Sequence, residues 1–250
     1  MNKVKKNIIL ARTSPRIKRS VMLTVRERVG LDKCATGSPT DRVELKTGRR
    51  FKLGQWNVKG LNSLGKLSIL SSELERLNIN ICGLSETKWS GFGHFMTLDG
   101  HTVLFSGSKE REHHRVVIWI HERVASYLTT RSSSRVNSAT FAAKPRDVTL
   151  IQYYAPTVDK PDEEIEDFYK EVDHVITETP KQNLLVITGD FNARVGEDAG
   201  ENDVLGKYGH GQRNDKGQTL VDFCAEHKLF ITNTIFRLHN RKSPDGITRA

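Results

Sequence analysis

The sequence predicts an α+β fold in which two β-sheets pack together and helices lie outside them. The first observation is the order of the segments, which is strand, helix, several strands, helix, strand, helix, strand. This order is neither a strict alternation of strands and helices nor an all-β pattern, which favours a two-sheet sandwich. The second is that 250 residues are enough to bury one substantial core. The third is the lack of internal repeats, so we expect a single domain.

The first 50 residues differ from the rest of the chain in charge. Met1 to Arg50 carries 14 Lys and Arg and 4 Asp and Glu, a net charge of +10, whereas residues 51–250 carry 25 basic and 26 acidic residues. No strand or helix period persists in this segment. The sequence therefore predicts a basic, disordered arm over residues 1–50 and a folded domain over residues 51–250. The arm is either a solvated leader or a handle for nucleic acid or nuclear import.

The first half of the domain combines one helix with several strands. Residues 52–57 predict a strand that ends in a polar side chain. An amphipathic helix is predicted by apolar residues at helical spacing, namely Leu67, Leu70, Leu74 and Leu77. Further strands are expected at 79–84, 102–105, 116–120, 136–143 and 148–154.

The second half is predicted to contain two helices and two strands. A helix is indicated by one apolar face, namely Ile165, Phe168, Tyr169, Val172 and Ile176. Acidic residues at 162–164 suit the first turn of this helix, where the helix dipole favours negative charge. We then expect a strand at 184–188, a glycine-rich loop at 196–217, a helix around 219–227 and a strand at 230–234.

The cysteines and the apolar runs bear on the compartment. Cys34, Cys82 and Cys224 are odd in number and contain no C-x-x-C pair, so we expect neither a disulfide framework nor a zinc site. No apolar run approaches the roughly 20 residues of a membrane span, so we expect no membrane partner. We expect an intracellular protein in the nucleus. A mitochondrial location is the alternative, because Met1 to Arg26 contains Arg and Ser but no acidic residue before Glu27.

Polar residues end four of the predicted strands: Asn57, Glu86, Tyr154, and Asp190 with Asn192. Strand ends that feed loops are where proteins of this class build sites, because the sheet holds the side chains rigidly. Each residue also has an ordinary structural interpretation, as a turn cap, a surface acid or a core aromatic. Together they indicate one shared centre if the strand ends lie on the same edge.

Asp190 and Asn192 follow an apolar strand and lie two residues apart. In extended chain, residues with this spacing point the same way, so a carboxylate would lie beside an amide. Mg2+ prefers oxygen ligands, and a scissile phosphate is stabilised by a neutral donor beside the metal. The pair therefore suits phosphodiester chemistry. The alternative is an Asx turn after a core strand.

Four motifs occur in the order and approximate spacing of a known family: WN at 56–57, LSETKW at 84–89, YAPT at 154–157 and GDFNARVG at 189–196. They resemble the endonuclease/exonuclease/phosphatase superfamily. The segments 206–224 and 231–236 resemble its non-LTR retrotransposon branch, whose domains are similar to apurinic endonucleases. The resemblance covers about residues 51–236 and implies the family's four-layered fold.

The resemblance also implies roles for individual residues. Glu86 resembles the principal metal-binding carboxylate, with Asn57 beside the metal. Tyr154 resembles the tyrosine that contacts the scissile phosphate. Asp190 resembles the residue that positions or deprotonates the attacking water, and Asn192 the donor that stabilises charge developing on the phosphate.

The implied cofactor is Mg2+, with Mn2+ as a possible substitute, and the implied partner is DNA. We expect a monomer, and the sequence indicates no particular protein partner. Arg213 and Asn214 lie in the glycine-rich loop, where they would either contact the nucleic acid backbone or belong to a mobile surface loop.

The chain departs from the family pattern after residue 236. The family closes its domain with strands that bear an aspartate and a terminal Ser-Asp-His or similar sequence, and this sequence stops at Ala250 before them. Neither His239 nor Asp245 has the right context to replace them. We therefore expect a domain without its last strands and a weak or inactive nuclease. The alternative function is a catalytically inactive remnant that binds nucleic acid through the arm or has no function.

Overall fold

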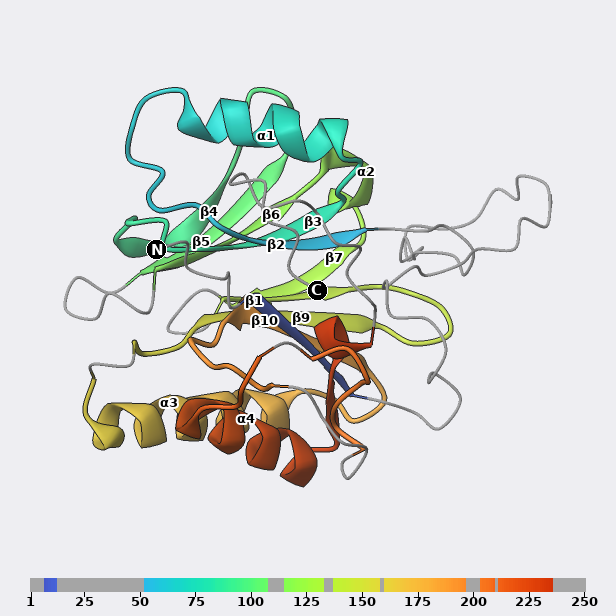
Figure 1. Cartoon of the computed structure of the whole chain (residues 1–250). Coiled ribbons are helices and arrows are strands. Elements are labelled where there is room, and N and C mark those ends of the chain that lie inside the picture. Colours follow the sequence, from blue (N-terminus) through green and yellow to red (C-terminus); the bar gives the residue numbers. More distant parts are fainter. Residues whose placement is uncertain are drawn as a thin grey trace.

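The computed structural model describes residues 7–12, 52–107, 115–132, 137–157, 160–196, 203–209 and 211–235. In these residues two β-sheets pack against each other and helices cover their outer faces, so the molecule has four layers (Figure 1). The predicted α+β two-sheet fold is confirmed.

The first sheet has five strands in the order β2-β3-β6-β5-β4. They are β2 (Leu53–Asn57), β3 (Ile81–Ser85), β4 (Gly91–Met96), β5 (Thr102–Gly107) and β6 (Val116–Ile120). Helix α1 (Lys66–Arg76) covers its outer face, because Leu70 and Leu74 pack there against Trp119 of β6. The indole of Trp119 also donates a hydrogen bond to the Ser71 hydroxyl at 3.0 Å, which ties the helix to the sheet. The short helix α2 (Glu122–Ala125) follows β6.

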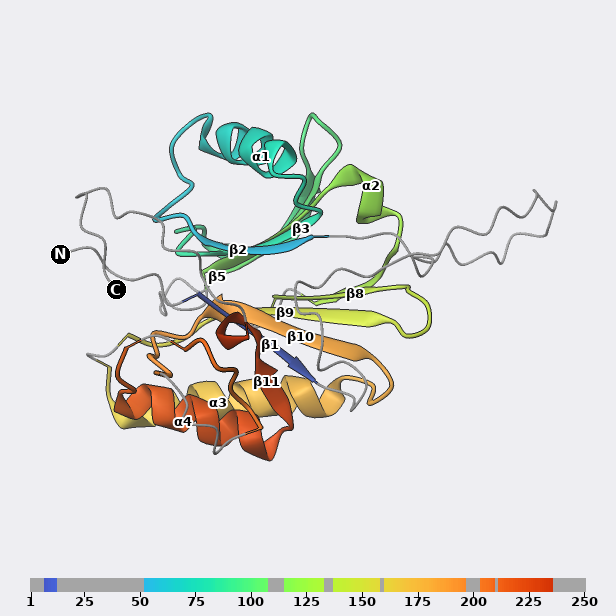
Figure 2. The same cartoon turned by 45° about the vertical axis from the view of Figure 1, so that its right-hand side comes forward.

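The second sheet has six strands in the order β11-β1-β10-β9-β8-β7. They are β1 (Asn7–Arg12), β7 (Leu128–Ser132), β8 (Asn137–Phe141), β9 (Val148–Tyr154), β10 (Leu184–Asp190) and β11 (Leu229–Ile231). Helices α3 (Asp162–Glu178) and α4 (Asp215–Glu226) cover its outer face (Figure 2). The apolar side of α3 is buried there through Phe168, Val172 and Ile176, as its sequence period predicts.

Strand β1 corrects the prediction of a disordered arm over residues 1–50. Asn7–Arg12 lies between β10 and β11 and pairs antiparallel with both, so that Leu10 is opposite Ile187 on one side and Ile231 on the other. Both edges of β1 are thus satisfied by strands that lie far away in the sequence, and a local period gives no sign of such pairing. The other residues of the predicted arm lie outside the described residues.

Several boundaries differ from those predicted. The last strand ends at Ile231, and a 3-10 helix, η2 (Thr232–Thr234), replaces the end of the expected strand at 230–234. Helix α4 begins at Asp215, four residues before the expected start. Strands β4 and β7 and helix α2 were not expected. In β4 every residue is exposed or only partly buried, so the apolar alternation that marks a half-buried strand is missing.

Parallel pairing sets the position of the predicted site residues. β2 runs parallel to β3, which places Asn57 opposite Ser85, and β9 runs parallel to β10, which places Tyr154 opposite Asp190. An apolar cluster between the sheets joins residues such as Ile118 of the first sheet to Leu150 and Val186 of the second. The ends of these four strands therefore meet at one rim of the sandwich.

Candidate active site

The side chain of Asn57 joins the two predicted carboxylates. Its Nδ2 donates to Glu86 Oε1 at 2.7 Å and to Asp190 Oδ2 at 3.3 Å. Glu86 directly follows β3 of one sheet, and Asp190 ends β10 of the other. One amide thus bridges acids from both sheets, as a shared centre requires.

The Tyr154 side chain points toward Glu86, in the same cluster as Asn57 and Asp190. Its hydroxyl donates to Glu86 Oε1 at 3.0 Å. Burial raises the pKa of Tyr154 well above its ordinary value, and the nearby charges of Glu86 and then Asp190 raise it further, while a hydrogen bond with Asn192 opposes them. The hydroxyl therefore keeps its proton at neutral pH and can act as a neutral hydrogen-bond donor.

Asp190 and Asn192 form a turn next to Tyr154 and Ala155. The Asn192 backbone N–H donates to Asp190 Oδ1 at 3.1 Å, which is the bond of an Asx turn. The Asn192 Nδ2 donates to the Ala155 carbonyl at 2.9 Å, and the Ala155 N–H donates to the Asp190 carbonyl at 2.9 Å. The Asx turn is therefore present, and it brings Asn192 beside Tyr154. The phosphodiester chemistry of the pair stays a prediction.

Left-handed backbone conformations concentrate in the loops around the site. Glu86, Lys88 and Asn192 have φ values of 58°, 64° and 50°, and Lys59, two residues after Asn57, has 52°. Residues other than glycine seldom adopt such values, and strain of this kind costs about 1–3 kcal/mol per residue. The other two such residues in the described chain, Asn78 and Lys228, each lie just after the C-cap residue of α1 or α4, where this conformation is common. The concentration at the strand ends indicates a functional site.

The oxygen atoms at this centre fit a hard divalent cation. Both hydrogen bonds to Glu86 reach Oε1, so Oε2 faces no donor among the bonds found in the described chain. Carboxylate oxygens are the ligands that Mg2+ prefers. Asn57, by contrast, turns its nitrogen to the carboxylates while its Oδ1 accepts from the Lys59 N–H at 3.2 Å. Asn57 orients Glu86 and Asp190. Its predicted contact with the metal would require the amide to rotate so that Oδ1 takes the place of Nδ2.

Arg213 and Asn214 hold the loop that follows Asn192. Asn214 caps α4, with Oδ1 accepting from the backbone N–H groups of Gly217 and Arg194, both at 2.9 Å. Arg213 donates to the Val195 carbonyl and to Gln218 Oε1, again at 2.9 Å. These bonds give both residues a structural role next to the site. Their predicted contact with nucleic acid stays a prediction.

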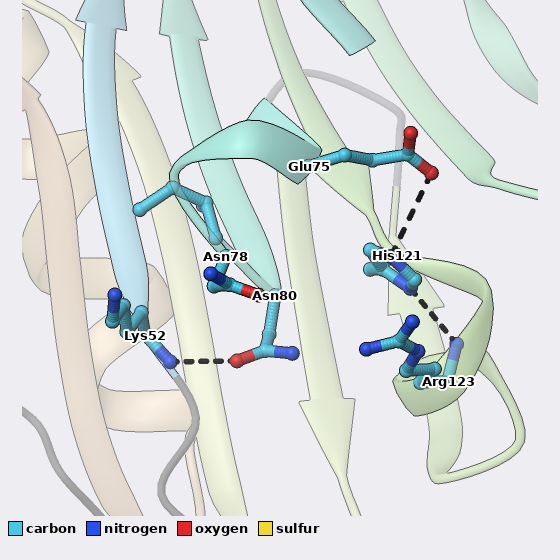
Figure 3. Close-up of a pocket in the computed structure, with 7 residues that line it drawn as sticks. Lys52, Glu75, Asn78, Asn80, His121 and Arg123 are labelled. Atoms are coloured by element: carbon cyan, nitrogen blue, oxygen red, sulfur yellow. Dashed lines mark hydrogen bonds and ion pairs between the residues drawn. The ribbon is translucent and has the colours of Figure 1, made fainter. Parts of the chain in front are cut away.

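A second polar cluster, missed in the sequence, lies at the opposite end of β3. Glu75 of α1, His101 before β5 and His121 after β6 place their ligand atoms within 4.8 Å of one another. Ile120 pairs with Ile81 at the start of β3, whereas Glu86 follows its end. Glu75 and His121 also line a pocket of about 370 Å³ that contains none of the predicted site residues (Figure 3). No sequence motif links these three residues, which come from separate elements.

The hydrogen bonds of this cluster favour direct pairing over metal binding. His101 Nδ1 accepts from the Glu122 N–H at 3.3 Å, and His121 Nδ1 accepts from the Arg123 N–H at 3.1 Å. Each neutral ring therefore carries its proton on Nε2. These atoms lie 3.1 and 3.8 Å from Glu75 Oε1, and a metal ion bound there would have to displace their protons. The cluster fastens α1 to the sheet.

We expect His121 to make stability fall in acid. Burial lowers the pKa of His121 below its ordinary value of 6.5, and the nearby charges of His101 and Arg123 lower it further, against Glu122 and Glu75. The unfolded chain then binds more protons than the folded chain, so stability decreases as pH falls through 6.5. His121→Asn keeps a capping oxygen for α2 without a titrating group. Thermal unfolding from about pH 7 to about pH 5 should show a shallower loss of Tm in this variant. An equal loss of Tm per pH unit in the variant and in the wild-type chain would show that His121 is not the cause.

The cysteines and the lengths of the helices bear on two further expectations, the lack of a disulfide framework and the lack of a membrane span. Cys82 and Cys224 are free and buried, while Cys34 lies outside the described residues. Within the described parts of the chain, none of the helices is both long and apolar enough to cross a lipid bilayer.

Comparison with known proteins agrees with this geometry. Residues 54–240 match the model of the Endonuclease/Exonuclease/phosphatase family, and this range contains all four motifs named above. Over 203 residues the chain is 37% identical to craniofacial development protein 2 of Bos taurus and 36% identical to that of Tragulus javanicus. These alignments cover 78% of this chain but 34% and 35% of the two relatives, so the chain spans about a third of their length.

A solved structure similar to this chain is the endonuclease domain of TRAS1, a telomere-specific non-LTR retrotransposon. The two are 17% identical with a TM-score of 0.46, and the match covers 69% of this chain and 68% of that one.

Proposed function

The chain belongs to the endonuclease/exonuclease/phosphatase family, and on that premise we propose that it is a Mg2+-dependent phosphodiesterase that cleaves DNA as an endonuclease. One observation carries the proposal. Glu86 and Asp190, which come from different sheets, share the single amide of Asn57, and Tyr154 donates to the same Glu86 oxygen. Two acids held this close beside neutral donors suit the cleavage of a phosphodiester.

Each side chain then has a distinct task. Asp190 is held by Asn57 on one oxygen and by the Asn192 N–H on the other, which fixes the direction in which it orients the attacking water. Tyr154 keeps its proton, which would turn from Glu86 Oε1 to a phosphate oxygen when the substrate binds, and Asn192 lies beside it as a second neutral donor. Donors placed in advance bind the transition state more strongly than the ground state. Mg2+, when bound at Glu86, would offset negative charge on the phosphoryl oxygens.

DNA is the substrate that the surroundings of the site favour. Lys59 and Lys88 are both exposed in the loops that carry site residues, where an ammonium group can contact a phosphate backbone. The segments 206–224 and 231–236 resemble the retrotransposon branch of the family, which favours DNA over smaller phosphodiesters. We further propose that the protein is a monomer and that it works in the nucleus. A fluorescent fusion expressed in cells would test the location.

A plasmid-nicking assay tests the function. The full chain is incubated with supercoiled plasmid in Mg2+, in Mn2+, and in excess chelator, and the nicked ends are extended with a polymerase to detect a 3′ hydroxyl. We expect nicking with either metal, none with chelator, and recovery when Mg2+ is restored. If no metal supports nicking by the folded protein, the proposal is wrong and the catalytically inactive remnant is the better description.

A further inference from the structure

A buried chain of hydrogen bonds lies directly beneath the candidate site. Gln152 of β9 donates from Nε2 to the Ser85 hydroxyl of β3 at 3.1 Å and accepts at Oε1 from the Thr188 hydroxyl of β10 at 2.5 Å. All three side chains are fully buried. Gln152 therefore links β9 and β10 of its own sheet to β3 of the opposite sheet.

Gln55 extends this chain to the fourth strand that supplies the site. Its Nε2 donates to the same Ser85 hydroxyl at 2.9 Å, which brings in β2. Every member of the network lies just before a site residue on its strand: Gln55 before Asn57, Ser85 before Glu86, Gln152 before Tyr154 and Thr188 before Asp190. Three of these pairs are two residues apart, so on an extended strand the two side chains point to the same face.

The space for this network is kept free by Gly83. A Cβ atom built on Gly83 would overlap Oε1 of Gln152 and would lie 2.5 Å from Oε1 of Gln55. A side chain at this position would therefore push both amides out of their places. The gap between the sheets at this point is shaped for the two glutamines.

We propose that Gln152 is a positioning residue, which sets the two sheets in the relation that lets Glu86 and Asp190 meet at Asn57. Apolar side chains between two sheets tolerate small shifts, whereas the buried bonds from Gln152 to Ser85 and Thr188 hold in only one arrangement of the strands. This inference rests on the proposed function for its kinetic effect. Its structural part, the control of Asn57 by Gln152, stands apart from catalysis.

Asn137 provides a matched control. It is opposite Gln152 in the ladder between β8 and β9, and it is also a fully buried amide. Its Nδ2 crosses to the other sheet as well, donating to the Leu104 carbonyl of β5 at 2.8 Å. It also donates to the Val116 carbonyl of β6 at 3.4 Å. None of β5, β6 and β8 carries a predicted site residue, so Asn137 shares the burial and the crossing of Gln152 but has no side-chain bond to a strand that supplies the site.

The kinetic test compares Gln152→Met with Asn137→Leu in the nicking assay. Both variants lose a buried amide, so both should lower Tm. We expect Gln152→Met alone to lower kcat, by roughly 10- to 100-fold, with a much smaller change in KM, because the reacting groups are displaced while the DNA surface is kept. Thr188→Val keeps the side-chain shape and provides a milder variant should Gln152→Met not fold. Equal kcat values for the Gln152 or Thr188 variant and the Asn137 variant would overturn the proposal.

A spectroscopic test needs no activity. In NMR spectra, the Asn57 side-chain amide signal can be assigned by its loss in Asn57→Ser, and its shift reports the bonds to Glu86 and Asp190. We expect this signal to move in Gln152→Met or Thr188→Val and to stay in place in Asn137→Leu. An unmoved signal in the Gln152 and Thr188 variants would refute the positioning role even if the wild-type chain nicks DNA. A moved signal in a chain without nicking would refute the proposed function alone.

Discussion

Replacing Asp190 by Asn is expected to slow metal-dependent nicking by about 100- to 10,000-fold, the range for loss of a general acid or base. Asp190 accepts hydrogen bonds on both oxygens, from the Asn57 amide and from the Asn192 N–H. An Asn at this position would turn an NH2 group against one of these donors and could not take a proton from water. Single-turnover nicking at a fixed Mg2+ concentration measures the loss.

Two comparisons make this result specific. Glu163→Gln removes an exposed carboxylate in the first turn of α3, on the outer helical layer, and should leave the rate unchanged. Glu86→Gln should also slow nicking, but added Mg2+ should restore part of the rate, because Glu86 is proposed to hold the metal. If Asp190→Asn responded to added Mg2+ in the same way, its assignment to the attacking water would be wrong.

The candidate site residues could be picked out in the sequence because each ends or follows an apolar strand in a recognisable motif. The structure adds how they meet, through parallel pairing that sets Asn57 beside Ser85 and Tyr154 beside Asp190. The direction of the Asn57 amide was beyond prediction, because it depends on carboxylates from two sheets. The same holds for Gln152, whose partners Ser85 and Thr188 become neighbours only after the sheets pack.

Elements held by distant residues escaped prediction. β1 has no local period and is recognised only through its pairing with β10 and β11. β4 is an edge strand in which Phe92 and Met96 stay 69% and 71% exposed, so it lacks the buried side that produces alternation. The cap made by Asn214 was hidden because the expected start of α4 was placed too late. Sequence periods therefore identified the buried core better than the edges.

Replacing Gly189 by Ala should strongly destabilise the protein and damage the site. Gly189 lies in β10 opposite Tyr153 of β9, and a Cβ atom there would overlap the Tyr153 carbonyl oxygen. A flexible side chain could move away, but this obstacle is backbone, so the two strands must separate. Overpacking in a core costs about 1–3 kcal/mol, and we expect the upper part of this range. Denaturant unfolding measures the change in the free energy of unfolding.

Gly54→Ala is the matched control for this prediction, because Gly54 is also a strand glycine. A Cβ atom there would lie 3.4 Å from Cys82 Sγ and from Ile79 Cγ2, an ordinary contact distance. Gly54→Ala should therefore fold with little loss of stability. The residues next in register after Gly189 and Tyr153 are Asp190 and Tyr154, so separating β9 from β10 moves both away from Glu86. Nicking by the folded fraction of Gly189→Ala should fall for this reason, and a rate equal to that of Gly54→Ala would show that the site tolerates the shift.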